Sequence, residues 1–227
     1  MIFCYEIVYE NIHNYFVILS RYIYMKYWPS IWIISLLFVS FSLRATAQDL
    51  SKSTQQVFIS PQLSLHTLSG GEITLSQALG KHEFELFIFL SPECPLCQNY
   101  SVPLNDLYLK FHNYSIAWIG IIPGRGFSDE QIQDFINRYH IRFPVYVDAD
   151  MQLTHVLGAS VTPQVILLNR KGKLLYSGAI DNWAVSLGQQ RTIITQHYLQ
   201  DALNNSLKGI PLTITRTQPV GCYINDF

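Results

Sequence analysis

Charge of either sign is scarce in this chain: 14% of its 227 residues are charged, and the formal net charge is -1. A nucleic-acid-binding protein would show a basic excess or a basic stripe, so this balance argues against nucleic acid as a partner. An acidic disordered chain is also excluded, because 49% hydrophobic residues are enough to fill a core. There is no internal repeat and no low-complexity tract, and no uncharged apolar run reaches the ~20 residues that span a bilayer, which argues against a multi-span membrane protein.

Cysteine is also sparse, with four residues in the whole chain. Cys4 falls in an apolar leader, and the remainder carries only Cys94, Cys97 and Cys222. A small protein held together by disulfides would use many more cysteines. The three that remain therefore indicate reactive cysteines rather than disulfides that stabilise the fold.

The hydrophobic residues are unevenly distributed, since 32 of the first 47 residues belong to this class. Met25-Lys26 supplies a start and a positive charge, and Ile31 to Leu43 is an uncharged run of 13 residues. Ala45-Thr46-Ala47 then places small residues at positions -3 and -1 of a cut before Gln48. This order is typical of a secretory signal peptide, so we expect export to the periplasm or cell envelope. A leader that stays uncleaved would instead anchor the protein to the membrane, its only expected membrane contact.

The first 24 residues do not fit this leader, because Glu6 and Glu10 are unsuited to a positively charged n-region. We therefore hypothesise that translation starts at Met25 and that 25–47 is the signal peptide. Residues 48–56 are polar and are expected to form a linker. A folded domain is expected over 57–208, followed by a C-terminal tail over 209–227.

Apolar runs of strand length alternate with helical patterns along the domain, which predicts an α/β fold with helices flanking a central mixed sheet. Ser128 and Gln131 form a capping box at the start of the clearest helix. A late hairpin around 169–172 adds antiparallel strands at one edge, and a terminal helix closes the domain. The expected strands are Glu72–Leu75, Phe84–Leu90, Ile116–Ile122, Phe143–Val147, Gln164–Leu168 and Lys173–Tyr176. The expected helices are Ser76–Leu79, Pro95–Phe111, Asp150–Leu157, Gln189–Leu207 and the one capped at Ser128, which carries Ile132, Phe135, Ile136 and Tyr139 at helical spacing.

Cys94-Pro95-Leu96-Cys97 is the most informative motif, because it directly follows a buried strand and opens a helix. A thiolate at a helix start faces unpaired backbone N–H groups and the positive end of the helix dipole, which lowers its pKa. The two intervening residues let the second sulfur reach back over one turn and attack a mixed disulfide formed by the first. We therefore predict that Cys94 attacks and that Cys97 resolves.

Cysteines at this spacing have three other uses in proteins: structural zinc binding, haem attachment and a structural disulfide. Structural zinc needs four ligands, and no second C-x-x-C is present, so neither a resident metal nor another cofactor is expected. Haem attachment needs a histidine after the second cysteine, where this chain has Gln98. A purely structural disulfide between Cys94 and Cys97 remains open.

The run FELFIFL followed by SPECPLC and a helix resembles the active-site segment of the thioredoxin superfamily. Val161-Thr162-Pro163-Gln164-Val165 resembles the cis-proline loop of that family. The resemblance covers about Val57 to Leu207 and is closest to the redoxin-like thiol-disulfide oxidoreductases of bacterial envelopes. It implies a thioredoxin-like fold, a redox-active centre serving cell redox homeostasis, and a cis Pro163 packed against the cysteines. It also implies that Thr162 offers backbone hydrogen bonds to a substrate segment.

Three positions depart from the family pattern. Glu93 stands where thioredoxins commonly have tryptophan, and a carboxylate beside Cys94 opposes thiolate formation. Ile88 occupies the place of a buried acid, and Glu85 is expected to point elsewhere. The dipeptide between the cysteines is Pro-Leu rather than Gly-Pro, which changes the reduction potential in a direction the sequence does not give.

Cys222 lies beyond the terminal helix, and two interpretations remain open. Either the tail folds back so that Cys222 exchanges with the Cys94–Cys97 pair or with a partner, or Cys222 is an inert thiol. The function expected is an exported thiol-disulfide oxidoreductase acting on protein dithiols and disulfides, recycled by an unidentified redox partner. The alternatives are a peroxiredoxin-like thiol peroxidase and a non-enzymatic copper-delivery or redox-sensing module on the same fold.

Overall fold

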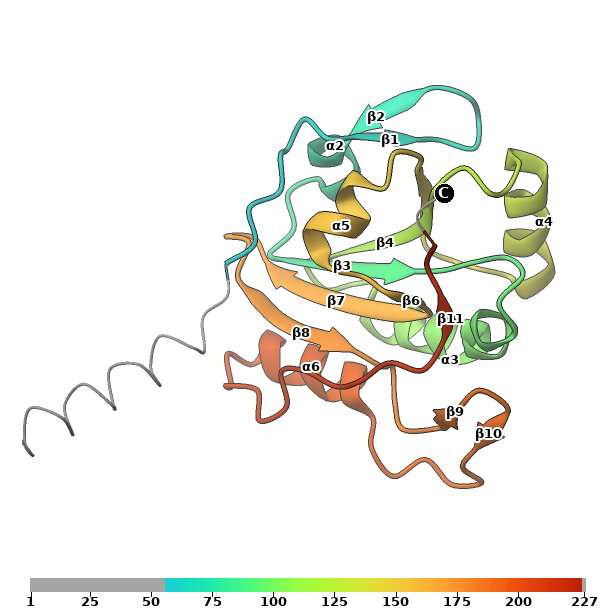
Figure 1. Ribbon diagram of the computed structural model, residues 1–227. Coiled ribbons are helices and arrows are strands. Elements are labelled where there is room, and N and C mark those ends of the chain that lie inside the picture. The colour runs from blue at the N-terminus through green and yellow to red at the C-terminus, as the bar shows by residue number, and fades with distance from the viewer. Residues whose placement is uncertain (1–55, 226–227) are drawn as a thin grey trace, which may run out of the picture. The chain divides into compact units, whose positions relative to one another are not determined.

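A mixed β-sheet forms the centre of residues 56–225, the part of the chain that the computed structural model describes. Its strands are β1 (Ser64–His66), β2 (Glu72–Thr74), β3 (Phe84–Phe89), β4 (Ile116–Pro123), β5 (Val145–Asp148), β7 (Gln164–Asn169) and β8 (Leu174–Gly178). They lie in the order β2-β1-β5-β4-β3-β7-β8 (Figure 1). β4 is parallel to both β3 and β5, whereas β7 is antiparallel to β3 and β8 to β7. The mixed sheet and its late hairpin confirm the predicted fold class.

Helices cover both faces of this sheet (Figure 1). They are α2 (Leu75–Leu79), α3 (Pro95–Phe111), α4 (Asp129–Tyr139), α5 (Gln152–Leu157) and α6 (Tyr198–Leu207). Buried side chains of α3, α4 and α6 share one core cluster, and those of α2 and α5 share another. The domain is therefore a three-layer arrangement with a helical layer on each side of the sheet.

Strand β3 lies at the centre of these layers and explains the long apolar run in the sequence. Leu86, Phe87, Ile88 and Phe89 are all fully buried. Successive side chains point to opposite faces, so Leu86 and Ile88 join the core beneath α3, and Phe87 and Phe89 join the core beneath α5. A strand covered on both faces needs apolar residues at every position, which is why no alternation is visible here.

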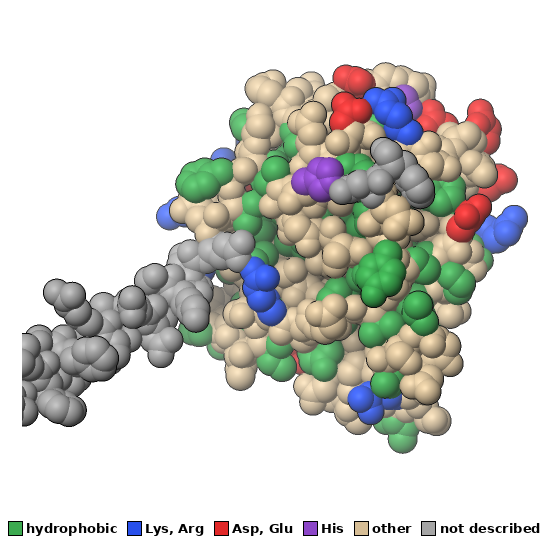
Figure 2. Space-filling model, in the orientation of Figure 1, with side chains coloured by type: hydrophobic (Ala, Val, Ile, Leu, Met, Phe, Trp, Pro, Cys, Tyr) green, Lys and Arg blue, Asp and Glu red, His purple; other side chains and the backbone are tan. Residues whose placement is uncertain are grey.

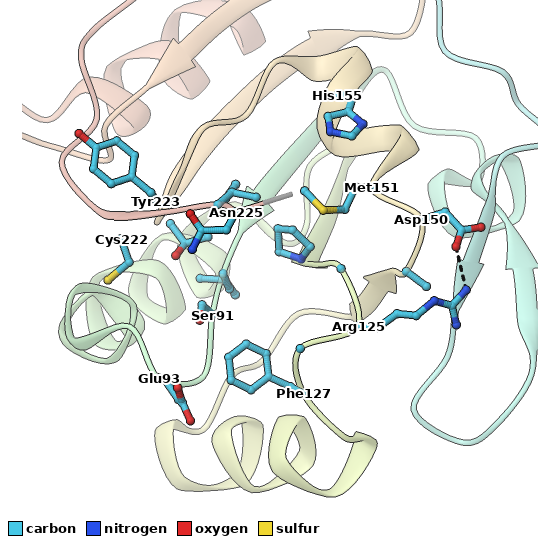
Figure 3. Close-up of a pocket in the computed structure, with 17 residues that line it drawn as sticks. Ser91, Glu93, Arg125, Phe127, Asp150, Met151, His155, Cys222, Tyr223 and Asn225 are labelled. Atoms are coloured by element: carbon cyan, nitrogen blue, oxygen red, sulfur yellow. Dashed lines mark hydrogen bonds and ion pairs between the residues drawn. The ribbon is translucent and has the colours of Figure 1, made fainter. Parts of the chain in front are cut away.

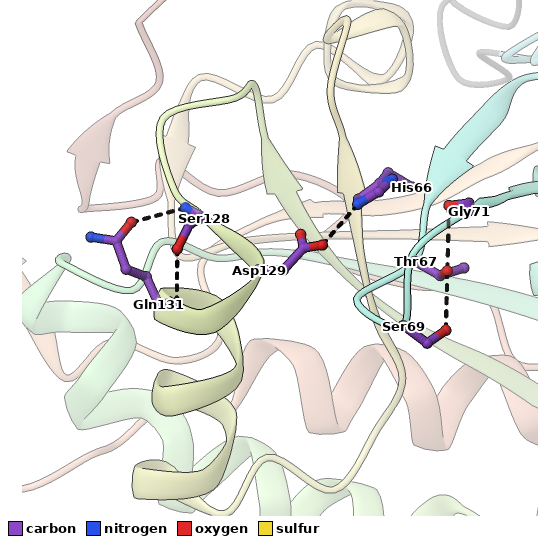
Figure 4. Close-up of polar contacts among 7 residues, drawn as sticks. All are labelled: His66, Thr67, Ser69, Gly71, Ser128, Asp129 and Gln131. Atoms are coloured by element: carbon purple, nitrogen blue, oxygen red, sulfur yellow. Dashed lines mark hydrogen bonds and ion pairs between the residues drawn. The ribbon is translucent and has the colours of Figure 1, made fainter.

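The start of α4 confirms the predicted capping box (Figure 4). The Ser128 hydroxyl accepts a hydrogen bond from the Gln131 backbone N–H at 3.3 Å, and the Gln131 side chain accepts one from the Ser128 backbone N–H at 2.9 Å. One residue later, the Asp129 carboxylate lies 3.1 Å from Nε2 of His66 on β1. This contact ties the start of α4 to β1, the strand next to the edge strand β2.

The predicted helix over Gln189–Leu207 is wrong for residues 189–197. A short hairpin of β9 (Ala184–Ser186) and β10 (Gln189–Gln190) turns at Gly188, whose φ is +78°. The Asn182 side chain then accepts hydrogen bonds from two backbone N–H groups of the following segment, at 3.0 and 3.2 Å. These bonds compete with helix formation, and the β-branched run Thr192 to Thr195 disfavours it further.

Other boundaries moved by only a few residues. The strand predicted over Phe143–Val147 begins at Val145, and the helix predicted from Asp150 begins at Gln152. A second antiparallel hairpin, β1 with β2, lies at the sheet edge opposite β8. Its turn contains Ser69-Gly70-Gly71, and β1 pairs with β5 through His66 and Val147.

The tail after residue 208, which the sequence set apart from the domain, packs against it. It runs along β8, where Ser177 donates its backbone N–H to Thr215 at 3.0 Å and accepts one from Thr217 at 3.1 Å. It ends in β11 (Cys222–Tyr223), which is antiparallel to β6 (Val161–Thr162), as Figure 1 shows. The tail therefore connects one edge of the sheet to the segment that contains Pro163.

The predicted signal peptide, linker and start at Met25 lie outside the described residues, apart from Gln56. Within residues 56–225, none of the helices has both the length and the apolar character needed to cross a membrane.

Candidate active site

The first element of the site is the start of α3, immediately after the buried strand β3. Cys94 is the N-cap residue with extended backbone angles, and Pro95 occupies the first helical turn. Proline suits this position because its fixed φ matches the helix and its missing N–H would have no partner there. Cys97 lies one turn further and is fully buried, and its sulfur accepts a hydrogen bond from the Ser91 backbone N–H at 3.4 Å.

The second element is the loop that the resemblance assigned to substrate binding. The Thr162–Pro163 peptide bond is cis. The Sγ atom of Cys94 lies 3.0 Å from the carbonyl oxygen of Thr162, and both residues are buried. The structure thus brings Cys94, Cys97, Thr162 and Pro163 together from positions nearly 70 residues apart.

The third element is Cys222, which the C-terminal strand brings to the same place. Its Sγ atom lies 2.7 Å from Sγ of Cys94, and all three cysteines of the described region are free thiols. Cys222 is paired with Thr162 in the β11–β6 register. Of the two interpretations of Cys222, the structure places the tail in the folded-back arrangement.

The surroundings of Cys94 favour its thiolate, and its pKa is lowered from 9.0 to about 5. The largest cause is a hydrogen bond from the Cys97 thiol, followed by the opposing effect of burial and then by a hydrogen bond from the Cys222 thiol. Backbone N–H groups of Cys97 and Cys222 contribute in the same direction, although no capping hydrogen bond of regular geometry forms at Cys94. The contact with the Thr162 carbonyl serves only the protonated thiol and works against the shift.

The other two sulfurs are shifted in the opposite direction. Burial raises the pKa of Cys97 well above its usual value, and the neighbouring Cys94 adds to the effect. Burial and the contact with Cys94 raise the pKa of Cys222 to about 12. At neutral pH the site therefore holds one nucleophilic thiolate and two thiols that donate hydrogen bonds to it.

The departures from the family pattern have clear positions. Glu93 is exposed at the rim, where water screens the carboxylate, and the Cys94 pKa is low despite it. Ile88 is fully buried beneath the site and offers no acid. Glu85 lines a separate pocket with Val57 and Arg170, and burial raises its pKa. Its side chain belongs to the opposite face of β3, as the sequence predicted.

A buried polar cluster that the sequence did not single out supports α3. The hydroxyl of Tyr100 donates to the Asp181 carboxylate at 2.7 Å, and the Trp183 backbone N–H donates to the same oxygen at 2.8 Å. The rings of Tyr100 and Trp183 meet edge to face at 5.3 Å. Asp181 lies in an irregular segment 81 residues from Tyr100, so no local sequence pattern indicates that these two residues pair.

A groove of about 850 Å³ opens beside the cysteines (Figure 3). Its walls are the loop before α3, the loop after β4, the start of α5 and the C-terminal strand, and residues from each are labelled in the view: Ser91, Glu93, Arg125, Phe127, Asp150, Met151, His155, Cys222, Tyr223 and Asn225. Arg125 donates to Asp150 at 2.7 Å on this wall. The groove reaches Cys222 and Thr162, whereas Cys94 and Cys97 are buried behind them and do not line it.

The groove carries few charged groups, which are Glu93 at its rim and Arg125 paired with Asp150. In Figure 2, acidic side chains gather toward α4 and the β1–β2 hairpin, whereas the centre of the face carries mainly uncharged groups. No three histidine, cysteine or acidic side chains between residues 56 and 225 are arranged to hold a metal ion.

Comparison with known proteins agrees with this architecture. Thiol-disulfide oxidoreductase ResA of Bacillus thuringiensis (strain Al Hakam) is 25% identical over 115 residues, which are 51% of this chain and 64% of that protein. ResA of Bacillus subtilis (strain 168) is 26% identical over 115 residues, or 51% of this chain and 62% of that protein. This chain thus spans somewhat less than two thirds of the length of these relatives.

Two solved structures share the fold at low sequence identity. Hypothetical protein SMc02350 from Sinorhizobium meliloti 1021 has a TM-score of 0.63 and 22% identity, covering 75% of this chain and 96% of that one. An uncharacterized conserved protein from Geobacillus kaustophilus has a TM-score of 0.65 and 18% identity, covering 76% of this chain and 93% of that one. Residues 59–177, just over half of the chain, match the AhpC/TSA family. Strand β3, the cysteine pair and the cis-proline segment all fall within that match, and this chain therefore belongs to the AhpC/TSA family and has a thioredoxin-like fold.

Proposed function

We propose that this protein is an exported thiol-disulfide oxidoreductase that exchanges disulfides with protein substrates through Cys94 and Cys97. The observation that carries the proposal is the lowered pKa of Cys94, held at the start of α3 beside a protonated Cys97 and the Thr162–Pro163 bond. The likeness to ResA proteins, which are named thiol-disulfide oxidoreductases, supports the same reaction class.

The proposed exchange needs no cofactor. The Cys94 thiolate attacks one sulfur of a substrate disulfide, a Cys94–substrate disulfide forms, and the other substrate sulfur leaves as a thiolate that takes up a proton. Cys97 then gives up its proton and attacks Sγ of Cys94, which yields a Cys94–Cys97 disulfide and a reduced substrate. The reverse sequence oxidises a substrate dithiol. A second dithiol or disulfide protein must restore the starting state in either direction.

The substrate segment is proposed to bind as an extended strand against β6. Thr162 belongs to β6, and the pairing of β11 with β6 supports the idea that the backbone of β6 can pair with a further strand. The few charged groups of the groove, with Arg125 already paired to Asp150, fit an ordinary polypeptide segment better than a highly charged ligand. Thr162 and Pro163 would then position substrate, and Cys94 would perform the attack.

Export is proposed from the leader, on the pattern of Lys26, the apolar run Ile31 to Leu43 and the Ala45-Thr46-Ala47 cut site. Mass spectrometry of the mature protein from the cell envelope tests it. We expect a first residue at Gln48. A mature chain that begins before Met25 would contradict both the cleavage and the proposed translation start.

The activity is tested by mixing the reduced protein with a peptide disulfide and following release of the free peptide thiols. Cys94→Ser is expected to abolish release, whereas Cys97→Ser combined with Cys222→Ser should accumulate a Cys94–peptide mixed disulfide visible by intact mass. In a chain produced with residues 1–47 retained, Cys4→Ser is the matched control and should react at the rate of the unmodified chain. Full activity in a Cys94→Ser, Cys97→Ser double variant would disprove the proposal.

The same protein distinguishes the two alternative functions. Consumption of hydrogen peroxide without reaction on the peptide would indicate the peroxidase alternative. Tight Cu(I) binding without either reaction would indicate the copper-delivery alternative.

A further inference from the structure

The proposed nucleophile is closed to solvent, because Cys94 is only 1% exposed. The chain's own C-terminal strand covers it, with Sγ of Cys222 2.7 Å from Sγ of Cys94. Strand β11 also pairs with β6, the edge where the proposed function places a substrate strand. The tail thus supplies both features of a bound substrate, an extended backbone and a sulfur in contact with the nucleophile.

Specific contacts hold the tail on this path. The Thr217 hydroxyl accepts a hydrogen bond from the Ala179 backbone N–H at 2.9 Å and contacts the Tyr176 hydroxyl at 2.6 Å. Beyond the cysteine, the Ile224 backbone N–H donates to Ser160 at 3.0 Å. The strand is therefore fixed on both sides of Cys222.

Gly221 is the second independent sign that this docking is built into the sequence. It has no positive φ, so its backbone conformation is open to any residue. A Cβ atom at this position would overlap the carbonyl oxygen of Thr162 and would lie 2.7 Å from the Thr162 carbonyl carbon. Glycine is thus needed here only because the tail approaches the backbone of β6 so closely.

We propose that Cys222 is a third redox cysteine, and that the C-terminal strand is a built-in substrate that places Cys222 on Cys94 and keeps external disulfides out. This inference rests on the proposed function, since it assigns the internal partner of the same nucleophile. A substrate strand and the tail then compete for one edge of β6.

The internal exchange balances without an outside oxidant. In a chain that carries the Cys94–Cys97 disulfide, the Cys222 thiolate attacks Sγ of Cys94. The Cys94–Cys222 bond forms, the Cys94–Cys97 bond breaks, and the electron pair stays on Cys97, which takes up the proton that Cys222 released. The reverse attack by Cys97 frees the tail again.

The direct test uses the full chain with Cys4→Ser and Cys97→Ser, so that Cys94 and Cys222 are the only thiols. Glutathione disulfide supplies the oxidising equivalents: it forms a Cys94–glutathione disulfide, and Cys222 displaces reduced glutathione. We expect a loss of two hydrogens in intact mass and a non-reduced tryptic link between peptides 82–110 and 217–227. Absence of that link would overturn the proposal.

Two tail variants in the same background test whether the docked position of the C-terminal strand speeds formation of the Cys94–Cys222 link. Gly221→Val and Thr217→Val should each slow formation of the link at least about tenfold, which corresponds to 1.4 kcal/mol. Thr215→Val is the matched control, because its side chain is exposed two residues earlier on the same segment, and it should leave the rate unchanged. Unchanged rates in both tail variants would overturn the docking proposal.

The same tail variants, with all of the active-site cysteines retained, should react with the peptide disulfide at least about fivefold faster than the parent, because Cys94 is uncovered. Equal or slower reaction in folded Gly221→Val and Thr217→Val proteins would refute the shielding role.

Failure of the tail proposal is distinguishable from failure of the proposed function. If the parent reduces the peptide disulfide but no Cys94–Cys222 link forms, only the tail proposal fails. If the link forms but even Gly221→Val leaves the peptide disulfide intact, the proposed function fails.

Discussion

The pKa of Cys94 makes a prediction that can be measured directly on the reduced protein. A fall from 9.0 to about 5 corresponds to roughly 5 kcal/mol in favour of the thiolate. At pH 7, Cys94 is therefore about 99% ionised, compared with about 1% for an unperturbed thiol. Absorbance of the thiolate at 240 nm should rise by the amplitude of one sulfur with a midpoint near pH 5. Cys97 and Cys222 should stay protonated up to pH 8, because their pKa values are raised.

Variants identify which groups produce the shift. Removing a hydrogen-bond donor to a thiolate destabilises the charged form, so the pKa of Cys94 rises in both Cys97→Ala and Cys222→Ala. The rise should be larger for Cys97→Ala, because Cys97 makes the larger contribution. Cys222→Ser keeps a donor and should remain closer to the parent than Cys222→Ala. Cys4→Ser serves as the common background, so that only the three site sulfurs can contribute.

The proton count of the redox couple provides an independent check. Above pH 5 the reduced pair keeps only the Cys97 proton, so the potential of the Cys94–Cys97 couple should fall by about 30 mV per pH unit, as expected for one proton and two electrons. Below pH 5 both thiols are protonated, and the slope should steepen to about 59 mV per unit. A single absorbance step near pH 9, together with the steep slope up to that pH, would refute the reasoning.

Three further predictions concern stability, each measured as the free energy of unfolding in urea. Gly120→Ala should cost about 1–3 kcal/mol, because the new Cβ atom would lie 2.9 Å from Cγ2 of Val145 in a packed core; a neutral result would mean that β4 and β5 can separate freely. Tyr100→Phe should cost about 1–3 kcal/mol, because the buried Asp181 carboxylate loses its 2.7 Å partner; no loss would show that Asp181 is hydrated instead. Ser128→Ala should cost about 1 kcal/mol through loss of the α4 cap, and Ser128→Asp should restore most of it; equal stability of all three would exclude the capping bond.

The sheet and the helix starts were predictable because their signals are local. A strand buried on both faces is nearly continuously apolar, so Phe84–Leu90, interrupted only by Glu85, and Ile116–Ile122 were readable without any knowledge of their neighbours. The start of α3 could be placed because proline is favoured in the first turn of a helix, where Pro95 lies, and the start of α4 because Ser128 and Gln131 cap each other. The pairing of Cys94 with Thr162 and Pro163 came from family resemblance and not from local pattern.

The failures have a common physical cause. Residues 189–197 contain Ile193 and Ile194, which the sequence assigned to one helix with Leu199, Leu203 and Leu207, but the Asn182 side chain and a turn at Gly188 fix their backbone differently. Likewise, the pairing of Cys222 with Thr162 joins segments 60 residues apart, and nothing near residue 222 specifies that partner. Gly221 is needed for this contact, but the reason, which is the close approach of the Thr162 backbone, can be recognised only from the structure.

The proposed shielding and the proposed activation of Cys94 depend on the same contact, which raises the question of what remains when the tail leaves. Departure of β11 removes the hydrogen bond from Cys222 but not the larger one from Cys97, which lies on α3 and does not move with the tail. It also lets water reach the sulfur and so relieves the burial that opposes ionisation. The opened site therefore keeps a lowered Cys94 pKa, and displacement of the tail exposes a nucleophile that is already ionised at neutral pH.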